Sequence, residues 1–203
     1  MTEKKPIDLT DNEIHEASSV FSFDVSECSK RLKRGDDWQR TVHGHLFFDH
    51  ILTAMITEML VRPTELRIDR MAFATKVELA SSMGLLSVEW RGFLKAFNSL
   101  RNRIAHKLDF RVTRRHAVDL VNGSPDALKV VISDEHERFG GTLLQHCIKI
   151  NLLMLDIIRQ HHVAVRLHHA KQAARLRAAL DNLDKRGITI ERIHRALGED
   201  DGA

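Results

Sequence analysis

Apolar residues recur every three or four positions along most of the chain, a period that favours amphipathic helices over strands. The densest segment is WQRTVHGHLFFDHILTAMITEMLV, residues 38–61, which follows Asp36 and Asp37 and stops before Pro63. Either aspartate can cap a helix, and the density of apolar residues predicts that most of its surface is buried. Similar periods predict three further helices, over residues 11–35, over 68–83 with Gly84 as the stop, and over 88–108 with Ser87 as the cap.

The second half of the chain mixes clear and ambiguous patterns. Thr113 is placed to cap a short helix that ends at NGSP, residues 122–125. The segment LKVVIS, residues 128–133, is apolar and β-branched, so it predicts a short strand, with a helix as the alternative. Gly140 and Gly141 precede a long helical stretch to about Lys185, and ITIERIHRAL after Gly187 predicts a final helix.

These elements predict an all-α protein, an up-and-down helical bundle with a long C-terminal helical element. A chain of 203 residues is long enough for one sizeable core plus an appendage. We expect a flexible N-terminus over residues 1–11 and a helical domain over 12–140. Residues 141–203 are expected to form a C-terminal extension that packs on the bundle or on a partner.

Within the predicted helix 88–108, the stretch SLRNRIAHKLDF contains an arginine on the apolar side. With Leu100 at 0° and about 100° per residue, the apolar side chains span an arc of about 140°, and Arg101 lies inside it at about 100°. Asn98, Asn102 and His106 form a neighbouring polar stripe, each four residues from the next.

A charge in this position has two explanations. Arg101 either pairs with an acid such as Glu78 or Glu58 on another helix, or lies at the edge of a cleft, because an unpaired buried charge costs several kcal/mol. The pattern by itself leaves both open.

The sequence R-N-R-I-A-H, Arg101 to His106, resembles the arginine, polar residue, three residues, histidine signature of HEPN domains. The resemblance extends over about residues 38–122 and leaves the C-terminal part unexplained. It implies a homodimeric, metal-independent endoribonuclease, of the kind found among toxins and antiviral defence effectors, with RNA and an antitoxin or regulatory protein as partners. It also implies that Arg101, Asn102 and His106 are the catalytic residues. Leu108 stands where one subclass has a tyrosine, which disfavours the toxins of that subclass.

These residue types suit cleavage of RNA by its own 2′-hydroxyl. Histidine can accept or donate a proton near neutral pH, and arginine offers phosphate a planar fork that keeps its charge. Further basic side chains close to the motif suit a phosphate backbone, and a solvated basic face is the alternative. They are Arg103, Lys107, Arg111, Arg114 and Arg115.

Composition limits the other classes. The net charge of +3 is too small to indicate a strongly basic protein. The two cysteines, Cys28 and Cys147, lack metal-ligand spacing, and two unpaired thiols indicate a reducing cytoplasm. The first residues lack the apolar core of a signal peptide, and we expect no membrane contact. We expect no cofactor, since no phosphate-binding glycine loop is present. The thirteen histidines include no i, i+4 pair, so no metal site is expected, although His45 and Asp49 have that spacing.

The sequence is also compatible with two non-enzymatic classes of protein. The arrangement from the second predicted helix through SMGLL to the motif is also similar to the mannitol operon repressor family, an all-α type of transcriptional regulator that lacks the complete arginine-to-histidine signature. A non-catalytic binding protein or adaptor, in which the Arg101 face only joins subunits, is the other alternative.

Overall fold

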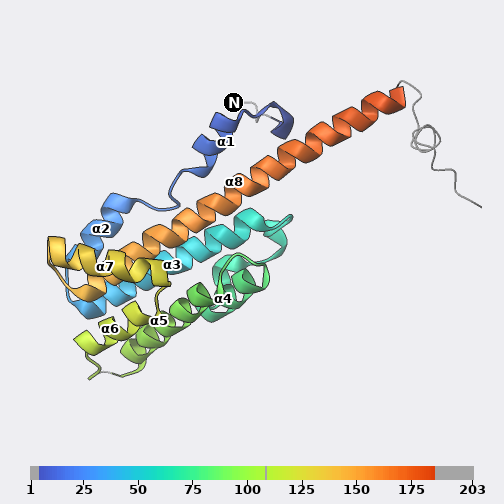
Figure 1. Cartoon of the computed structure of the whole chain (residues 1–203). Coiled ribbons are helices and arrows are strands. Elements are labelled where there is room, and N and C mark those ends of the chain that lie inside the picture. Colours follow the sequence, from blue (N-terminus) through green and yellow to red (C-terminus); the bar gives the residue numbers. More distant parts are fainter. Residues whose placement is uncertain (1–4, 108, 186–203) are drawn as a thin grey trace, which may run out of the picture. The chain divides into compact units, whose positions relative to one another are not determined.

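The computed structural model describes residues 5–107 and 109–185, and among these residues every regular element is a helix. The predicted all-α helical bundle with a long C-terminal helical element is confirmed (Figure 1). None of the described helices is both long and apolar enough to cross a membrane. The helices are α1 (Asp11–Ser18), α2 (Val25–Lys33), α3 (Asp37–Met59), α4 (Phe73–Ser82), α5 (Val88–His106), α6 (Arg114–Gly123), α7 (Asp126–Phe139) and α8 (Leu143–Lys185), with 3-10 turns η1 (Pro6–Asp8), η2 (Pro63–Glu65) and η3 (Ile68–Arg70).

The chain forms two compact units. The larger unit, here called the core bundle, comprises residues 19–163, and the described part of the smaller one comprises residues 5–18 and 164–185. The first half of α8 therefore belongs to the core bundle, whereas the sequence predicted a division near residue 140. The reason is packing, since Leu144, Ile148 and Leu152 of α8 are fully buried. In the smaller unit, Lys171 of α8 pairs with Asp11 of α1 at 2.8 Å.

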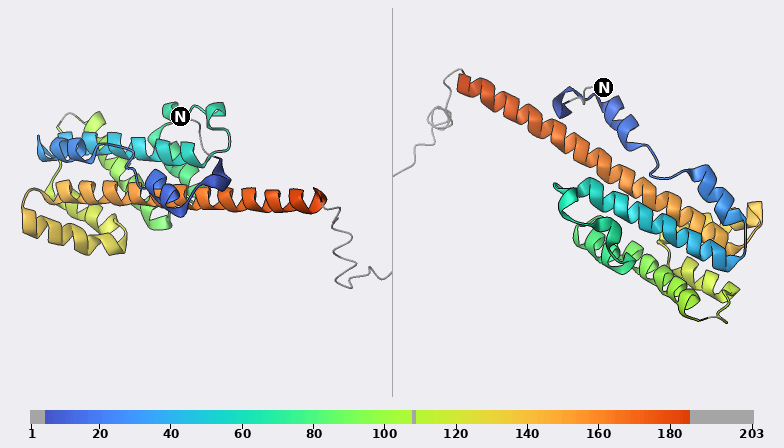
Figure 2. Two further views of the ribbon diagram at one scale, coloured as in Figure 1. Left: turned by 90° about the horizontal axis from the view of Figure 1, so that it is seen from above. Right: turned by 180° about the vertical axis from the view of Figure 1, so that it is seen from behind.

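Phenylalanine rings from two helices form the centre of the core bundle. Phe48 of α3 lies edge-on to Phe97 and Phe93 of α5, with ring centroids 5.0 and 5.7 Å apart. All three rings are fully buried. Helices α3 and α8 lie side by side in every view (Figures 1 and 2). The aromatic layer therefore fixes how α5 packs on α3.

The helix starts and stops follow the expected cap residues. Asp36 and Gln39 form a capping box at the start of α3, and the Ser87 hydroxyl accepts a hydrogen bond from the Trp90 backbone amide at the start of α5. Thr113 caps α6, and Gly84 ends α4 in the left-handed region with φ of +73°. These predictions are confirmed, whereas the final helix predicted after Gly187 lies outside the described residues.

Two helix predictions are wrong in their extent. The single helix expected over residues 11–35 is two helices, α1 and α2, because Asp24 accepts a hydrogen bond from the Glu27 amide and so starts a new helix. The helix expected from residue 68 begins only at Phe73, after the 3-10 turn η3.

The strand prediction for LKVVIS is also wrong, because these residues lie inside α7. Leu128 and Ile132, four residues apart, face the core, whereas Val130 is 66% exposed. A strand would have placed alternate residues on one face, so the burial pattern follows the helical period. The local β-branched preference is overridden by packing on α6 and α8.

Gly44 of α3 is required where three helices approach one another. A methyl group at this position would lie 2.7 Å from Cγ2 of Ile148 on α8 and 3.2 Å from Cζ of Phe97 on α5. We therefore expect Gly44→Ala to lower the free energy of unfolding by about 1–2 kcal/mol, since overpacking outweighs the gain in helix propensity. The matched control Gly92→Ala on α5, where a methyl group meets nothing within 4 Å, is expected to stabilise the protein by about 0.5–1 kcal/mol. Urea denaturation measures both, and a stabilised Gly44→Ala variant would contradict this packing.

Candidate functional site

Arg101 is half-buried on α5, and among residues 5–107 and 109–185 it has no acidic partner of the kind that an ordinary core-edge arginine has. Glu78 pairs with Arg91 at 2.7 Å and also with Lys95, while Glu58 pairs with Arg159 at 2.8 Å. Both acids considered as partners from the sequence are thus engaged elsewhere. The guanidinium of Arg101 instead donates one hydrogen bond to Oδ1 of Asn102 at 3.3 Å, and it forms no ion pair within the described part of the chain.

A histidine from α3 completes a polar cluster around this arginine. Nε2 of His45 donates to Oδ1 of Asn98 at 3.1 Å, and the imidazole lies against Phe73 with ring centroids 4.3 Å apart. His45, Asn98, Arg101 and Asn102 are called the Arg101 cluster below. It brings together Arg101 and Asn102 of the predicted motif, Asn98 of the polar stripe, and His45, which stands 53 residues before Asn98 in the sequence.

The environment keeps His45 neutral at physiological pH. Burial lowers the pKa of the imidazole below its usual value, and the nearby Arg101 charge lowers it further, against the opposing effect of the Asn98 hydrogen bond. Because Nε2 carries the proton that Asn98 accepts, Nδ1 of the neutral ring is left with its lone pair. A neutral imidazole beside a positive charge can accept a proton from a group that the arginine holds.

A buried ion pair lies next to the cluster. Lys76 of α4 is 1% exposed, and its ammonium donates to both carboxylate oxygens of Asp49 at 2.7 and 2.8 Å. Both oxygens of Asp49, the acid four residues after His45, are therefore engaged by Lys76. Among the residues described, no group of three or more histidine, cysteine or acidic side chains could hold a metal ion.

His106 lies apart from Arg101. It is the last residue of α5, is exposed, and shares no hydrogen bond with Arg101 or Asn102 within the described structure. Five residues of helix separate the two motif ends by about 7.5 Å along the axis and about 140° around it. His106 instead borders an open hollow of about 570 Å³, together with Lys107, Asp109 and Phe110. One chain thus presents the two halves of the motif at separate places.

The five predicted RNA-contacting residues are all exposed, and none pairs with a carboxylate in the portion that the structure describes. The guanidinium of Arg103 covers the Phe110 ring, 5.2 Å from its centroid. His116, which follows this basic group, has a structural role, because its Nδ1 accepts the Thr113 backbone amide at 3.0 Å. Burial lowers the pKa of His116, and the charge of Arg103 lowers it further, which favours that acceptor form. The end of α5 and the start of α6 therefore carry uncompensated positive charge. The residues are Arg103, Lys107, Arg111, Arg114 and Arg115.

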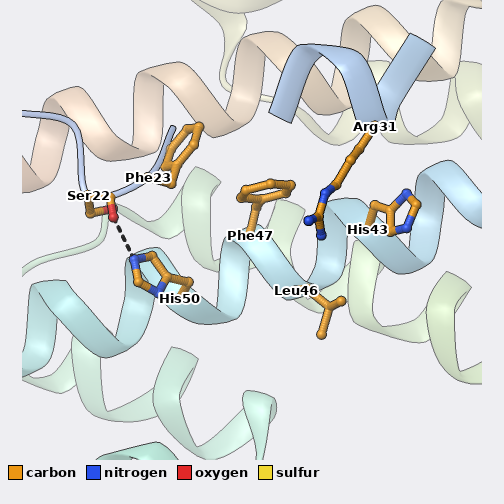
Figure 3. Close-up of a pocket in the computed structure, with 7 residues that line it drawn as sticks. All are labelled: Ser22, Phe23, Arg31, His43, Leu46, Phe47 and His50. Carbon is orange, nitrogen blue, oxygen red and sulfur yellow. Dashed lines mark hydrogen bonds between the residues drawn. The ribbon is translucent and has the colours of Figure 1, made fainter. Parts of the chain in front are cut away.

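The other histidines of α3 lie on a different face from His45. His43 and His50 line a small hollow of about 280 Å³ between α2 and α3, together with Phe23, Phe47 and Arg31 (Figure 3). His50 donates from Nε2 to the backbone carbonyl of Ser22 at 2.7 Å (Figure 3). Of these three histidines of α3, only His45 therefore belongs to the Arg101 cluster.

The chain matches no protein-family model, no curated protein and no solved structure. Its function is therefore inferred from the Arg101 cluster and from the charge around it.

Proposed function

We propose that the protein is a metal-independent endoribonuclease of the HEPN type that acts as a homodimer. The observation that carries this proposal is the half-buried Arg101, which has no carboxylate partner among the described residues and lies beside the neutral His45. A half-buried arginine without a carboxylate partner is unfavourable for stability, and its guanidinium is available to bind an external anion. RNA phosphate is the anion that the surrounding basic residues favour.

Each residue then has a chemical role. Arg101 binds the scissile phosphate and stabilises the charge that develops on it, while Asn102 orients the guanidinium through their hydrogen bond. The two proton transfers need an acceptor for the 2′-hydroxyl proton and a donor for the leaving 5′-oxygen. His106 is the motif histidine for one of these transfers. We assign the other to His45, whose neutral imidazole is suited to accept a proton.

The dimer follows from the separation of the motif within one chain. Arg101 and His106 diverge around α5, so a single copy does not bring them to one phosphate. Two copies that face each other can place His106 of one chain near Arg101 of the other. Trp38 of α3, 48% exposed, lines a hollow with Phe110 and Arg111 after the end of α5 and offers apolar surface for such a contact.

On the same resemblance we propose a biological setting. The enzyme acts as a toxin or a phage-defence effector in the cytoplasm, and an antitoxin or regulatory protein holds it inactive. A nuclease of cellular RNA needs such control, and the exposed basic group at the end of α5 is a surface that an acidic partner can cover.

The test is incubation of the purified protein with mixed cellular RNA and excess chelator, beside His106→Ala and His45→Gln variants. We expect cleavage by the wild type and a loss of about 10²–10⁴-fold in rate for each variant, as for removal of a general acid or base. Gel electrophoresis follows the products, and 2′,3′-cyclic phosphate ends identify attack by the 2′-hydroxyl. His50→Gln, on the opposite face of α3, is the matched control and should cleave at the wild-type rate.

Two outcomes would overturn the nuclease. No cleavage by any form, or equal residual cleavage by the wild type and the His106→Ala variant, would favour a non-catalytic binding protein. Binding of the intact protein to a DNA operator in place of RNA would favour a regulator similar to the mannitol operon repressor.

A further inference from the structure

A polar cavity that shares no residue with the Arg101 cluster lies where α7 turns into α8. It has a volume of about 540 Å³, which is within the range of small-molecule sites. Its walls come from the end of α2, the end of α7 and the first two turns of α8. Gly140 and Gly141 join α7 to α8 with φ of +63° and +85°, so that the connection turns sharply and leaves the cavity open beside it.

A buried histidine with one unused nitrogen lines this cavity. His146 is 3% exposed, and its Nε2 donates to the backbone carbonyl of Gly140 at 2.6 Å. In the neutral form of the ring this leaves a lone pair at Nδ1, and that atom is buried with no hydrogen-bond partner among the described residues. Leaving such a buried atom without a hydrogen-bond partner is unfavourable, so a ligand that supplies a donor gains from it.

An acidic side chain lies close to that nitrogen. Oε2 of Glu135 lies 3.8 Å from Nδ1 of His146, too far for a hydrogen bond. When an imidazole nitrogen with a free lone pair lies beside a carboxylate, both are hydrogen-bond acceptors, and each needs a donor from another group. The ammonium of Lys149 supplies one to Glu135, at 3.3 Å, and leaves the histidine nitrogen unsatisfied.

The cavity also offers positive charge and an aromatic wall. Lys33, the last residue of α2, lines it and has no ion-pair partner among the described residues, and the N-terminus of α8 adds a favourable dipole for an anion. Phe139 stands at the rim with 71% of its surface exposed, where a planar ring can stack on it. Acceptors, cations and an exposed ring therefore surround one space.

We infer that this cavity binds a mononucleotide whose base presents adjacent N–H donors, which favours guanine over uracil. The edge of the base donates hydrogen bonds to Glu135 and to Nδ1 of His146, and the ring of the base stacks on Phe139. The phosphate of the nucleotide binds the ammonium of Lys33. Guanine carries two neighbouring donors that match the two oxygens of a carboxylate, whereas uracil has a single one between two acceptors. The site stands on its own contacts and does not depend on the nuclease proposal.

Calorimetric titration of the full-length protein with GMP and with UMP tests the inference. The titrations use the Arg101→Ala variant, so that the Arg101 cluster contributes no phosphate binding. We expect saturable, sub-millimolar binding of GMP and binding of UMP that is weaker by about tenfold or more. Because substitution of the buried His146 can unfold the bundle, the varied residues are Glu135 and Lys33, which reach the surface.

Glu135→Gln is expected to weaken GMP binding by about tenfold and Lys33→Ala by about fivefold. The matched controls Glu137→Gln on α7 and Lys30→Ala on α2 are exposed residues outside the cavity lining and should leave it unchanged. Absence of GMP binding at millimolar concentration would overturn the inference. So would equal affinity for GMP and UMP, or equal weakening by the cavity variants and their controls.

Discussion

Arg101→Ala is expected to lower the rate of RNA cleavage by about a thousandfold. The guanidinium is the only charged member of the Arg101 cluster; the side chain is half-buried, and its hydrogen bond to Asn102 orients it. Loss of one preorganised donor to a developing oxyanion costs about 10²–10³ in rate, and an arginine finger on a phosphoryl group is worth about 10³–10⁵. The measurement is the initial cleavage rate of a fluorescent RNA under single-turnover conditions.

Two further variants separate chemistry from folding and from bulk charge. Arg101→Lys keeps the charge without the planar fork and is expected to recover only a small part of the activity. Arg91→Ala, on the same helix, removes an exposed arginine that pairs with Glu78 and should retain the wild-type rate. If the Arg91→Ala and Arg101→Ala variants lose activity equally, Arg101 contributes only to the overall electrostatic potential of the protein, and its proposed role at the phosphate is wrong.

The helices and their ends were predictable because local physical chemistry determines them. The capping residues Asp36, Ser87 and Thr113 and the glycine after α4 are recognisable from their neighbours in the sequence. The errors arose where distant residues decide. The Asp24 cap marks the start of α2 locally, but the segment before it is held by the hydrogen bond of Ser22 to Asp156, 134 residues later, which no local pattern reveals.

The candidate site was predictable only in part, for the same reason. The wheel of α5 placed Arg101 inside the apolar arc and beside Asn102, and the structure agrees. It could not show that Glu78 and Glu58 pair with Arg91 and Arg159, so that Arg101 has no ion pair in the part of the chain that the structure describes. It also could not select His45 from thirteen histidines, because that choice depends on the register of α3 against α5 at Asn98.

Arg159→Met is expected to lower the free energy of unfolding of the core bundle by about 3–5 kcal/mol. The guanidinium, 5% exposed, donates to Asp156 at 2.8 Å, to Glu58 at 2.8 Å and to the backbone carbonyl of Val20. Asp156 is fully buried, and it also accepts hydrogen bonds from the hydroxyl and amide of Ser22. Without Arg159, a buried carboxylate loses its counter-charge and the segment before α2 loses its anchor.

The pH dependence of this loss identifies the carboxylate as its cause. Burial alone would raise the pKa of Asp156, but the hydrogen bonds from Arg159, Ser22 and Gln160 together bring it below its usual value. A lowered folded-state pKa stabilises the protein above the unfolded pKa near 4, and this contribution disappears as the pH falls through the folded value. The stability difference between the wild type and the Arg159→Met variant should therefore be full at pH 7 and shrink below about pH 4.

Urea denaturation across this pH range measures the stability difference. The control is Arg31→Met, which breaks an exposed pair with Glu27 and is expected to cost less than about 1 kcal/mol at any pH. A loss for Arg159→Met that stays constant down to pH 3 would assign the effect to packing of its side chain and not to the buried charge pair.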